Sequence, residues 1–170
     1  MGKAKTSTTE TARGFLELLS PLMAAPGVAK DTYRISLIGN FFNGPIYVEI
    51  YKRHKLLRDE VNTLFCLAHF PELIQRDICL VMGRPKNSVS RAISRLVKRD
   101  LIAVADDPRD GRRGVLTLKP AGRKLYNQTR QLVVERENLM LASLNARERR
   151  SLDKLLTKLM THYKDWSDLY

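Results

Sequence analysis

The sequence predicts a mainly α-helical fold with one small β-hairpin. Apolar residues recur at helical spacing through most of the chain after residue 32. Two short apolar runs, residues 101–105 and 115–119, flank the turn-like stretch DDPRDGRRG, which is the pattern of a hairpin with a charged tip. With 170 residues, 44% of them hydrophobic and 28% charged, the chain is long enough for one domain with a real core and flanking helices.

The N-terminal residues 1–32 are weakly patterned and are expected to form a loosely ordered extension. They contain no continuous apolar core or cleavage pattern of a signal peptide, and no apolar run in the chain reaches the length of a membrane span. A cytoplasmic protein without a membrane partner is expected. Residues 33–55 have a helical pattern that Gly44-Pro45 interrupts. Either the helix kinks there or a second helix starts with Asn43 as its cap.

The central segment, residues 56–119, predicts two short helices, a tight turn, a third helix and the hairpin. Residues 59–70 form an apolar helix with Asp59 as its expected cap. A shorter helix follows from about residue 73 to residue 82, and Gly83 stops it.

The helix expected after that turn, within residues 84–99, has one apolar face and one polar, basic face. The apolar residues have the spacing of a stripe that faces a core, and they are Val89, Ala92, Ile93, Leu96 and Val97. Residues 84–99 contain no acid, whereas a solvated helix normally mixes acids with bases. We therefore expect the polar residues to contact nucleic acid: Lys86, Asn87, Ser88, Ser90, Arg91, Ser94, Arg95 and Lys98.

Two further helices are expected in residues 120–170. The first is long and amphipathic, and the last begins at Asn145, which with Glu148 makes a capping box. The apolar stripe of the last helix runs from Leu152 to Tyr163. Such stripes carry more apolar surface than the core of one monomer needs.

A short helix, a tight turn, a helix with a polar face and a hairpin together make a winged helix-turn-helix. Asn can pair bidentately with adenine and Arg with guanine, while Ser and Lys suit phosphates. The net charge of +12 favours an anionic partner, and residues 84–113 contain nine basic and four acidic residues. Double-stranded DNA is therefore the predicted partner, rather than the anionic membrane surface that basicity alone would also suit.

Two stretches, DICLVMGRPKNSVSRAISRLVKRDLI and DDPRDGRRGVLTLKPAG, resemble the MarR family of bacterial transcriptional regulators. The likeness rests on Val-Ser-Arg early in the polar helix, an Arg-Leu pair midway, the Leu-Ile entry to the hairpin and the Asp-x-Arg motif at its tip. It covers about residues 59–123. The chain departs from the family's pattern at Pro85, where a capping Ser is frequent, and at Lys119, where a Thr is common.

The resemblance implies a winged helix-turn-helix core flanked by dimerisation helices at residues 33–55 and 120–170. It implies a homodimer that binds a palindromic operator as a repressor and is released by a small-molecule effector. In the hairpin tip, it implies that Asp110 orients Arg112 into a minor groove, with Arg109 and Arg113 on phosphates. Because these arginines cancel the charge of the neighbouring acids, no metal site is expected there, and no cofactor is expected.

The family resemblance also implies an effector pocket between the dimerisation helices and the winged domain. It would take an aromatic or phenolic acid, or a CoA thioester. Its candidate lining, for which core packing is the alternative at every position, is Phe41, Phe42, Tyr47, Tyr51, His69 and Phe70.

No catalytic motif is visible, so no enzyme is predicted. Two other functions stay open. One is a basic architectural or RNA-binding winged-helix protein without an effector. The other is a redox-sensing regulator that uses Cys66 or Cys79, which ranks lower because both thiols lie in apolar helical segments.

Overall fold

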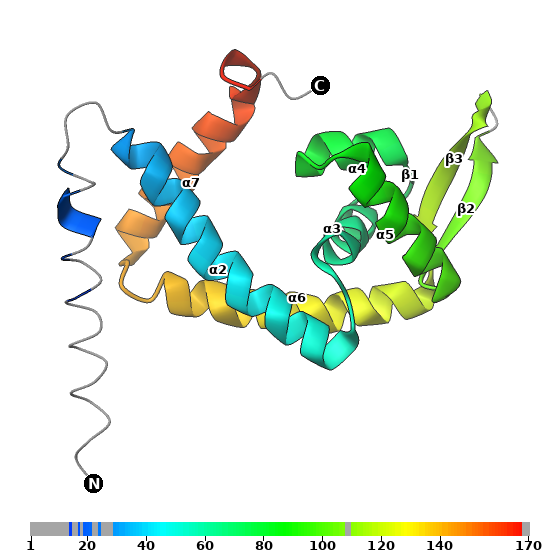
Figure 1. Cartoon of the computed structure of the whole chain (residues 1–170), viewed down its shortest axis with the longest axis horizontal. Helices are drawn as coiled ribbons and strands as arrows, with labels where there is room; N and C mark the ends of the chain where they lie inside the picture. The colour runs from blue at the N-terminus through cyan, green and yellow to red at the C-terminus, as the bar shows by residue number, and fades with distance from the viewer. Residues whose placement is uncertain are drawn as a thin grey trace, which may run out of the picture. The chain divides into compact units, whose positions relative to one another are not determined.

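The computed structural model describes residues 29–107 and 110–167, together with residues 14, 17, 19–21 and 24; at residues 107 and 110–113 it describes the backbone only. The expected N-terminal extension, residues 1–32, thus lies mostly outside the described residues. The fold is mainly helical with a small antiparallel sheet, as predicted (Figure 1). The chain divides into two compact parts, residues 1–43 and residues 44–170.

Helix α2 spans Lys30–His54 and contains Pro45 in its interior. The alternative in which a second helix starts at Asn43 is therefore wrong. Proline removes one backbone donor, and a helix of 25 residues retains enough other hydrogen bonds to continue. Ile46 and Ile50 are its buried residues. The helix ends at His54, and the next residue, Lys55, has a positive φ of 53°.

Three short helices follow, with boundaries close to those predicted: α3 at Arg58–His69, α4 at Gln75–Met82 and α5 at Lys86–Lys98. Gly83 ends α4 in the left-handed conformation, with φ 57° and ψ 39°, which confirms its predicted role. A two-residue strand, β1 (Leu73–Ile74), stands where the sequence predicts the start of a helix. Two residues are too few to show the alternation of side chains that is typical of a strand. Strand β1 is therefore recognisable only from its pairing with another strand.

The hairpin consists of β2 (Ile102–Asp107) and β3 (Asp110–Leu118). These strands extend well into the stretch that the sequence predicts to be a turn. Antiparallel pairing continues from Ile102 opposite Leu118 to Asp106 opposite Gly114, and β1 adds to the other edge of β3, giving the order β1-β3-β2. The hairpin projects beyond the helices as a wing (Figure 1).

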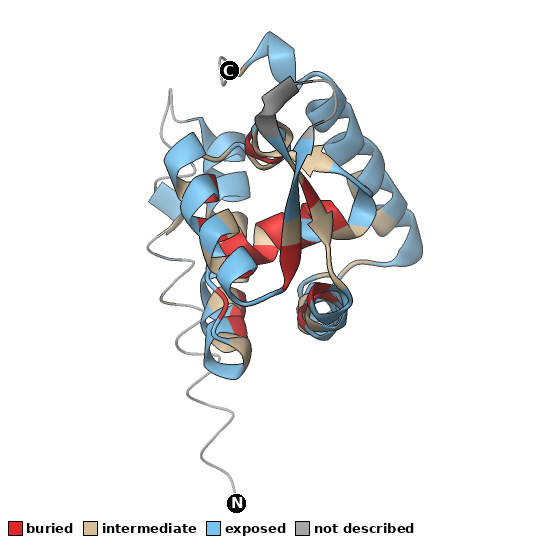
Figure 2. Ribbon diagram, turned by 90° about the vertical axis from the view of Figure 1, so that its right-hand side faces the viewer, coloured by how far each residue is buried: buried red, intermediate tan, exposed pale blue. Residues whose placement is uncertain are grey.

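The core of residues 44–170 lies between α3, α5 and the base of the sheet. Buried residues are coloured red on the ribbon in Figure 2. The residues with fully buried side chains include Ile50, Leu56, Leu64, Leu67, Ile78, Val89, Leu96 and Ile102. Helix α3 packs on α5 and on α6. The apolar stripe of α5 is buried as predicted at Val89, Ala92 and Leu96, whereas Val97 is 41% exposed and was wrongly placed in the core.

The C-terminal region contains α6 (Pro120–Met140), α7 (Ala146–Thr161) and a short 3-10 helix, Tyr163–Asp165. The predicted capping box is confirmed. The Asn145 side chain accepts hydrogen bonds from the backbone N–H groups of Arg147 and Glu148, and the Glu148 carboxylate accepts one from the Asn145 N–H. None of the described helices is both long and apolar enough to cross a bilayer.

Gly122 allows α6 to start directly against the first residue of the wing. A Cβ at this position would lie 2.1 Å from the backbone oxygen of Leu101 and 2.7 Å from Cδ1 of Leu118. The Leu101 oxygen is fixed in turn by a hydrogen bond of 3.1 Å from the Lys119 N–H. Backbone atoms have little freedom to move away, so any side chain at residue 122 displaces α6.

Gly122→Ala is expected to lower the free energy of unfolding by about 1–3 kcal/mol, as overpacking does, in urea denaturation followed by circular dichroism. The control is Gly39→Ala on α2, where the added Cβ meets only Asn43 Nδ2 at 3.9 Å. That change is expected to stabilise by about 0.5–1 kcal/mol. Equal effects of the two variants would contradict this account of Gly122.

Candidate nucleic-acid interface

The polar residues predicted to contact nucleic acid share one face of α5. Six of them are exposed: Lys86, Asn87, Ser90, Arg91, Ser94 and Lys98. Ser88 and Arg95 are half-buried at the edges of this face. On the opposite side of the helix, Val89, Ala92 and Leu96 fix α5 to the core. The polar face is thus presented to solvent on a helix whose rotation is fixed by packing.

The start of α5 is held without a side-chain cap. Pro85 occupies the cap position, and its side chain makes no capping hydrogen bond. Instead, the Gln75 Nε2 at the start of α4 donates to the Lys86 oxygen at 2.9 Å. This contact ties the two helices of the helix-turn-helix together at the end of α5 that carries Asn87.

Two arginines close to the polar face are paired with acids of α3. Nε of Arg95 donates to Oε1 of Glu60 at 2.5 Å, and Glu60 is only 2% exposed. Arg84, which precedes α5, forms two hydrogen bonds with the Asp59 carboxylate, at 2.7 and 3.1 Å. Asp59 therefore does not cap α3 as predicted. It lies inside the first turn, where its carboxylate accepts from Arg84.

The residues predicted to form the wing contact are described by the structure only in part. Arg109 is outside the described residues, and the side chains of Asp110, Arg112 and Arg113 are outside them too. The backbone places residues 110–113 at the start of β3. Among the residues that the structure does describe, no three side chains able to bind a metal come together.

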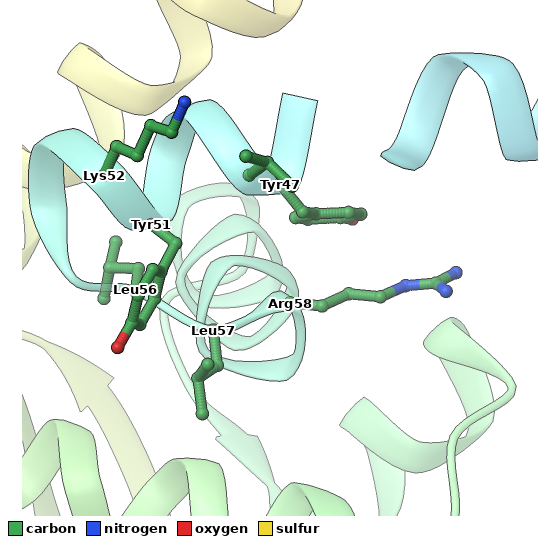
Figure 3. A pocket seen from close by; sticks show the side chains of 7 residues that line it. Tyr47, Tyr51, Lys52, Leu56, Leu57 and Arg58 are labelled. Atoms are coloured by element: carbon green, nitrogen blue, oxygen red, sulfur yellow. The ribbon is translucent and has the colours of Figure 1, made fainter. Parts of the chain in front are cut away.

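A pocket of about 480 Å³ lies where α2 ends and α3 begins (Figure 3). Of the predicted effector residues, Tyr47 and Tyr51 line it. Phe41 and Phe42 belong to the other compact part of the chain. The remaining lining residues, which the sequence does not predict, are Val48, Lys52, Leu56, Leu57 and Arg58. Their grouping depends on the turn between the two helices, for which the sequence carries no periodic signal.

His69 and Phe70, also predicted to line the pocket, are not among its lining residues. His69 lies at the end of α3, where its Nε2 shares a hydrogen bond of 2.9 Å with the hydroxyl of Tyr126 on α6. Phe65 stacks beside it, with the ring centroids 4.7 Å apart. This contact joins the winged domain to α6.

Tyr47 is the most constrained group in the pocket wall. Its hydroxyl donates to Oδ1 of Asn62 on α3 at 2.9 Å, and the Arg58 guanidinium lies 5.4 Å from its ring centroid. Burial raises the pKa of Tyr47, although Arg58 acts in the opposite direction. The phenol is therefore a neutral hydrogen-bond donor at neutral pH.

Both cysteines are buried and form no disulfide bond, Cys66 on α3 and Cys79 on α4. Burial raises the pKa of the Cys66 thiol to about 11 and raises that of Cys79 as well. At pH 8 a thiol with the pKa of Cys66 is ionised to the extent of only about one part in a thousand. We expect thiol labelling by DTNB at pH 8 to be at least about a hundredfold slower in the native than in the urea-unfolded protein. Rapid labelling of either native thiol would contradict this.

The central part of the chain matches a known protein family. Residues 54–113 match the family model described as the MarR family. This segment belongs to the MarR family. It runs from the end of α2 through the helix-turn-helix to the wing tip, so it contains the polar face of α5 and part of the pocket. A search of curated proteins finds no match for the chain.

The fold of the MarR-family segment and its flanking helices matches solved structures of regulators. Reduced MarR from E. coli has a TM-score of 0.65 at 19% identity, over 75% of this chain and 94% of that one. Bordetella bronchiseptica BpsR has a TM-score of 0.69 at 23% identity, over 80% and 96%. S. aureus MepR in complex with DNA has a TM-score of 0.67 at 23% identity, over 76% and 96%. At these identities the likeness establishes the fold.

Proposed function

We propose that this chain is a transcriptional regulator that binds double-stranded DNA in a sequence-specific manner and acts as a repressor in the cytoplasm, without enzymatic activity. The observation that carries the proposal is the exposed, acid-free polar face of α5 in a MarR-family winged helix-turn-helix. A helix of 13 residues fits the major groove, with Asn87 and Arg91 as candidate base readers. The fold is shared with MepR, whose structure contains DNA.

The test measures fluorescence anisotropy with short DNA duplexes that tile the region beside the gene, in the presence of bulk competitor DNA. A regulator prefers one tile over bulk DNA by at least about 10³-fold. Equal binding to all tiles would instead indicate an architectural protein, and preference for RNA an RNA-binding one; either result would overturn the proposal.

The regulator is proposed to act as a homodimer on a palindromic site, because a two-fold symmetric protein matches a two-fold symmetric operator. The support is the uncovered apolar face of α7. In that helix no residue is buried, and Leu155, Leu159 and Met160 are 60%, 48% and 65% exposed. An apolar stripe of this kind is expected to be covered by a second copy.

Leu155→Glu is expected to raise the dissociation constant of the homodimer at least about tenfold, because a carboxylate would be desolvated in the apolar contact. Sedimentation velocity over a concentration series measures this. Thr157→Glu, on the polar side of α7, serves as the control and is expected to leave association unchanged. If both variants remain equally dimeric, α7 is not the dimer contact.

The chain is further proposed to respond to a small-molecule effector. BpsR, which shares the fold, has its DNA binding regulated by 6-hydroxynicotinic acid. In this chain the pocket between α2 and α3 is the candidate site. The alternative in which a cysteine senses oxidants is disfavoured, since burial raises the pKa of both thiols.

A further inference from the structure

Helix α7 carries a second polar and basic face, on the side away from its apolar stripe. At 3.6 residues per turn, its exposed polar side chains fall within a sector of about 120° of the helix. They are Arg147, Arg150, Ser151, Lys154, Thr157, Lys158 and Thr161, and we call them the basic face of α7. Four of them are cations, and the two acids of the helix, Glu148 and Asp153, lie outside this face.

Contacts within the protein do not account for these four cations. None of them forms an ion pair with another residue in the part of the chain that the structure describes. Arg150, Lys154 and Lys158 recur at every fourth position, and like charges at this spacing destabilise a helix. Arg147 lies in the first turn, where the helix dipole disfavours a cation. The four cations therefore destabilise the free helix, and an anionic partner would reverse this effect.

Arg149 shows how a cation of the same helix is used when it supports the fold. It is half-buried, and its Nε and Nη2 donate to the backbone oxygens of Leu144 and Leu141 at 3.2 and 2.7 Å. These bonds satisfy carbonyls beyond the end of α6 and hold the start of α7 there. The capping box at Asn145 fixes the same turn. The basic face is thus presented by a helix whose first turn is held in place.

The basic face of α7 and the polar face of α5 are separate surfaces. Helix α6 starts directly after the wing, and its 21 residues correspond to a length of about 30 Å. Helix α7 follows the far end of α6, whereas α5 and the wing lie at the near end (Figure 1). Two DNA segments can therefore be held at the two ends of α6.

The dimensions and chemistry of the basic face fit a phosphate backbone. From Arg147 to Lys158 the face extends over about 16 Å. Phosphates of one DNA strand follow each other about every 3.4 Å along the duplex axis, so about five of them lie opposite the four cations. The hydroxyls of Ser151, Thr157 and Thr161 can donate to phosphate oxygens as well. Contacts of this kind hold a duplex without reading its sequence.

We propose that the basic face of α7 binds the phosphate backbone of a second DNA segment while α5 holds the first, so that the protein bridges two duplexes. The inference goes beyond the proposed function and rests on it only for the homodimer. In that dimer the face stays accessible, because the second copy covers the opposite side of α7, with Leu155 and Leu159. An anionic membrane surface is the less suitable partner, since a helix in a membrane interface buries its apolar side.

The experiment measures the capture of a second duplex. The preferred tile is immobilised on beads and loaded with the full chain, and a fluorescent duplex of unrelated sequence is then added. The wild type is expected to capture it. Arg150→Gln/Lys154→Gln is expected to reduce the capture at least about fivefold and to change the affinity for the immobilised tile by less than about twofold. The salt dependence of capture should become shallower by about two in log–log slope, since each phosphate contact contributes about 0.9.

Three further variants separate local charge from other effects. Arg150→Lys/Lys154→Arg keeps the charge of the face and should capture fully, because a phosphate contact depends mainly on charge. Lys124→Gln/Arg130→Gln removes the same two residue types from exposed positions of α6 and should also capture fully. Thr157→Glu adds an acid to the face while all its cations remain, and it is expected to reduce capture about threefold. Circular dichroism and sedimentation velocity check that each variant folds and dimerises.

Equal capture by the wild type and by Arg150→Gln/Lys154→Gln would overturn the inference, as would a wild type that captures no second duplex. In the latter case, sedimentation with phosphatidylglycerol vesicles that the same double variant abolishes would assign the face to a membrane surface instead. A wild type that captures a second duplex through α7 but prefers none of the tiles would overturn only the proposed function.

Discussion

Glu60→Ala is expected to lower the free energy of unfolding by about 3–4 kcal/mol. The carboxylate is 2% exposed and has two partners, Nε of Arg95 at 2.5 Å and the Leu57 N–H at 2.7 Å. Removal of this carboxylate leaves the Arg95 guanidinium beside the apolar core without its partner. It also leaves the Leu57 N–H at the start of α3 without its acceptor. The expected loss in free energy of unfolding lies toward the lower end of the range for breaking a buried ion pair. The reason is that the Arg95 side chain is 42% exposed and retains some hydration.

Urea denaturation at pH 7 measures this loss. The control is Glu49→Ala, which breaks the ion pair between Glu49 and Arg53 on the surface of α2, at 2.6 Å and with both side chains exposed by 40% or more. Exposed pairs contribute under about 1 kcal/mol, so the control is expected to lose little. Similar losses in the two variants would mean that Glu60 is not the central contact of the turn between α2 and α3.

The sequence predicts the recognition helix well because that helix is long enough to show its period. Thirteen residues with apolar side chains on one side and polar ones on the other fix both the helix and its rotation. Gly83 and the capping box at Asn145 were likewise predictable, since their effects are local. Strand β1 was not, because its two residues become a strand only through pairing with Leu116 and Val115, which lie about forty positions further along the chain.

The charge pattern indicates a face but not the partner of each cation. Arg95 was predicted to contact DNA together with Arg91, four residues earlier. The structure separates the two, because Arg95 lies at the edge of the face and reaches Glu60, 35 residues away in sequence. Arg84 and Arg99 also contribute to the basic charge of residues 84–113, yet Arg84 pairs with Asp59 at the start of α3 and Arg99 donates to the backbone oxygen of Lys55. Long-range pairs of this kind leave no trace in periodicity or composition.

The double variant Asn87→Ala/Arg91→Ala is expected to weaken binding to the preferred operator by about 10²- to 10⁴-fold. Each side chain is exposed on α5 and able to make a bidentate contact with a base, worth about 1–3 kcal/mol of discrimination. Binding to bulk DNA depends mainly on phosphate contacts and should weaken much less. The preference for one tile should therefore collapse, which competition anisotropy measures directly.

The matched control is Asn127→Ala/Arg130→Ala, which removes the same two residue types from exposed positions of α6. It changes the net charge equally, so an effect of charge alone would appear in both double variants. Neither pair of positions contributes a buried side chain, and both variants should unfold at the urea concentration of the wild type. If the α5 variant retained its preference for one tile, the bases would have to be read by another part of the molecule. The wing would then be the first candidate, since a narrow minor groove concentrates negative potential that attracts arginine side chains.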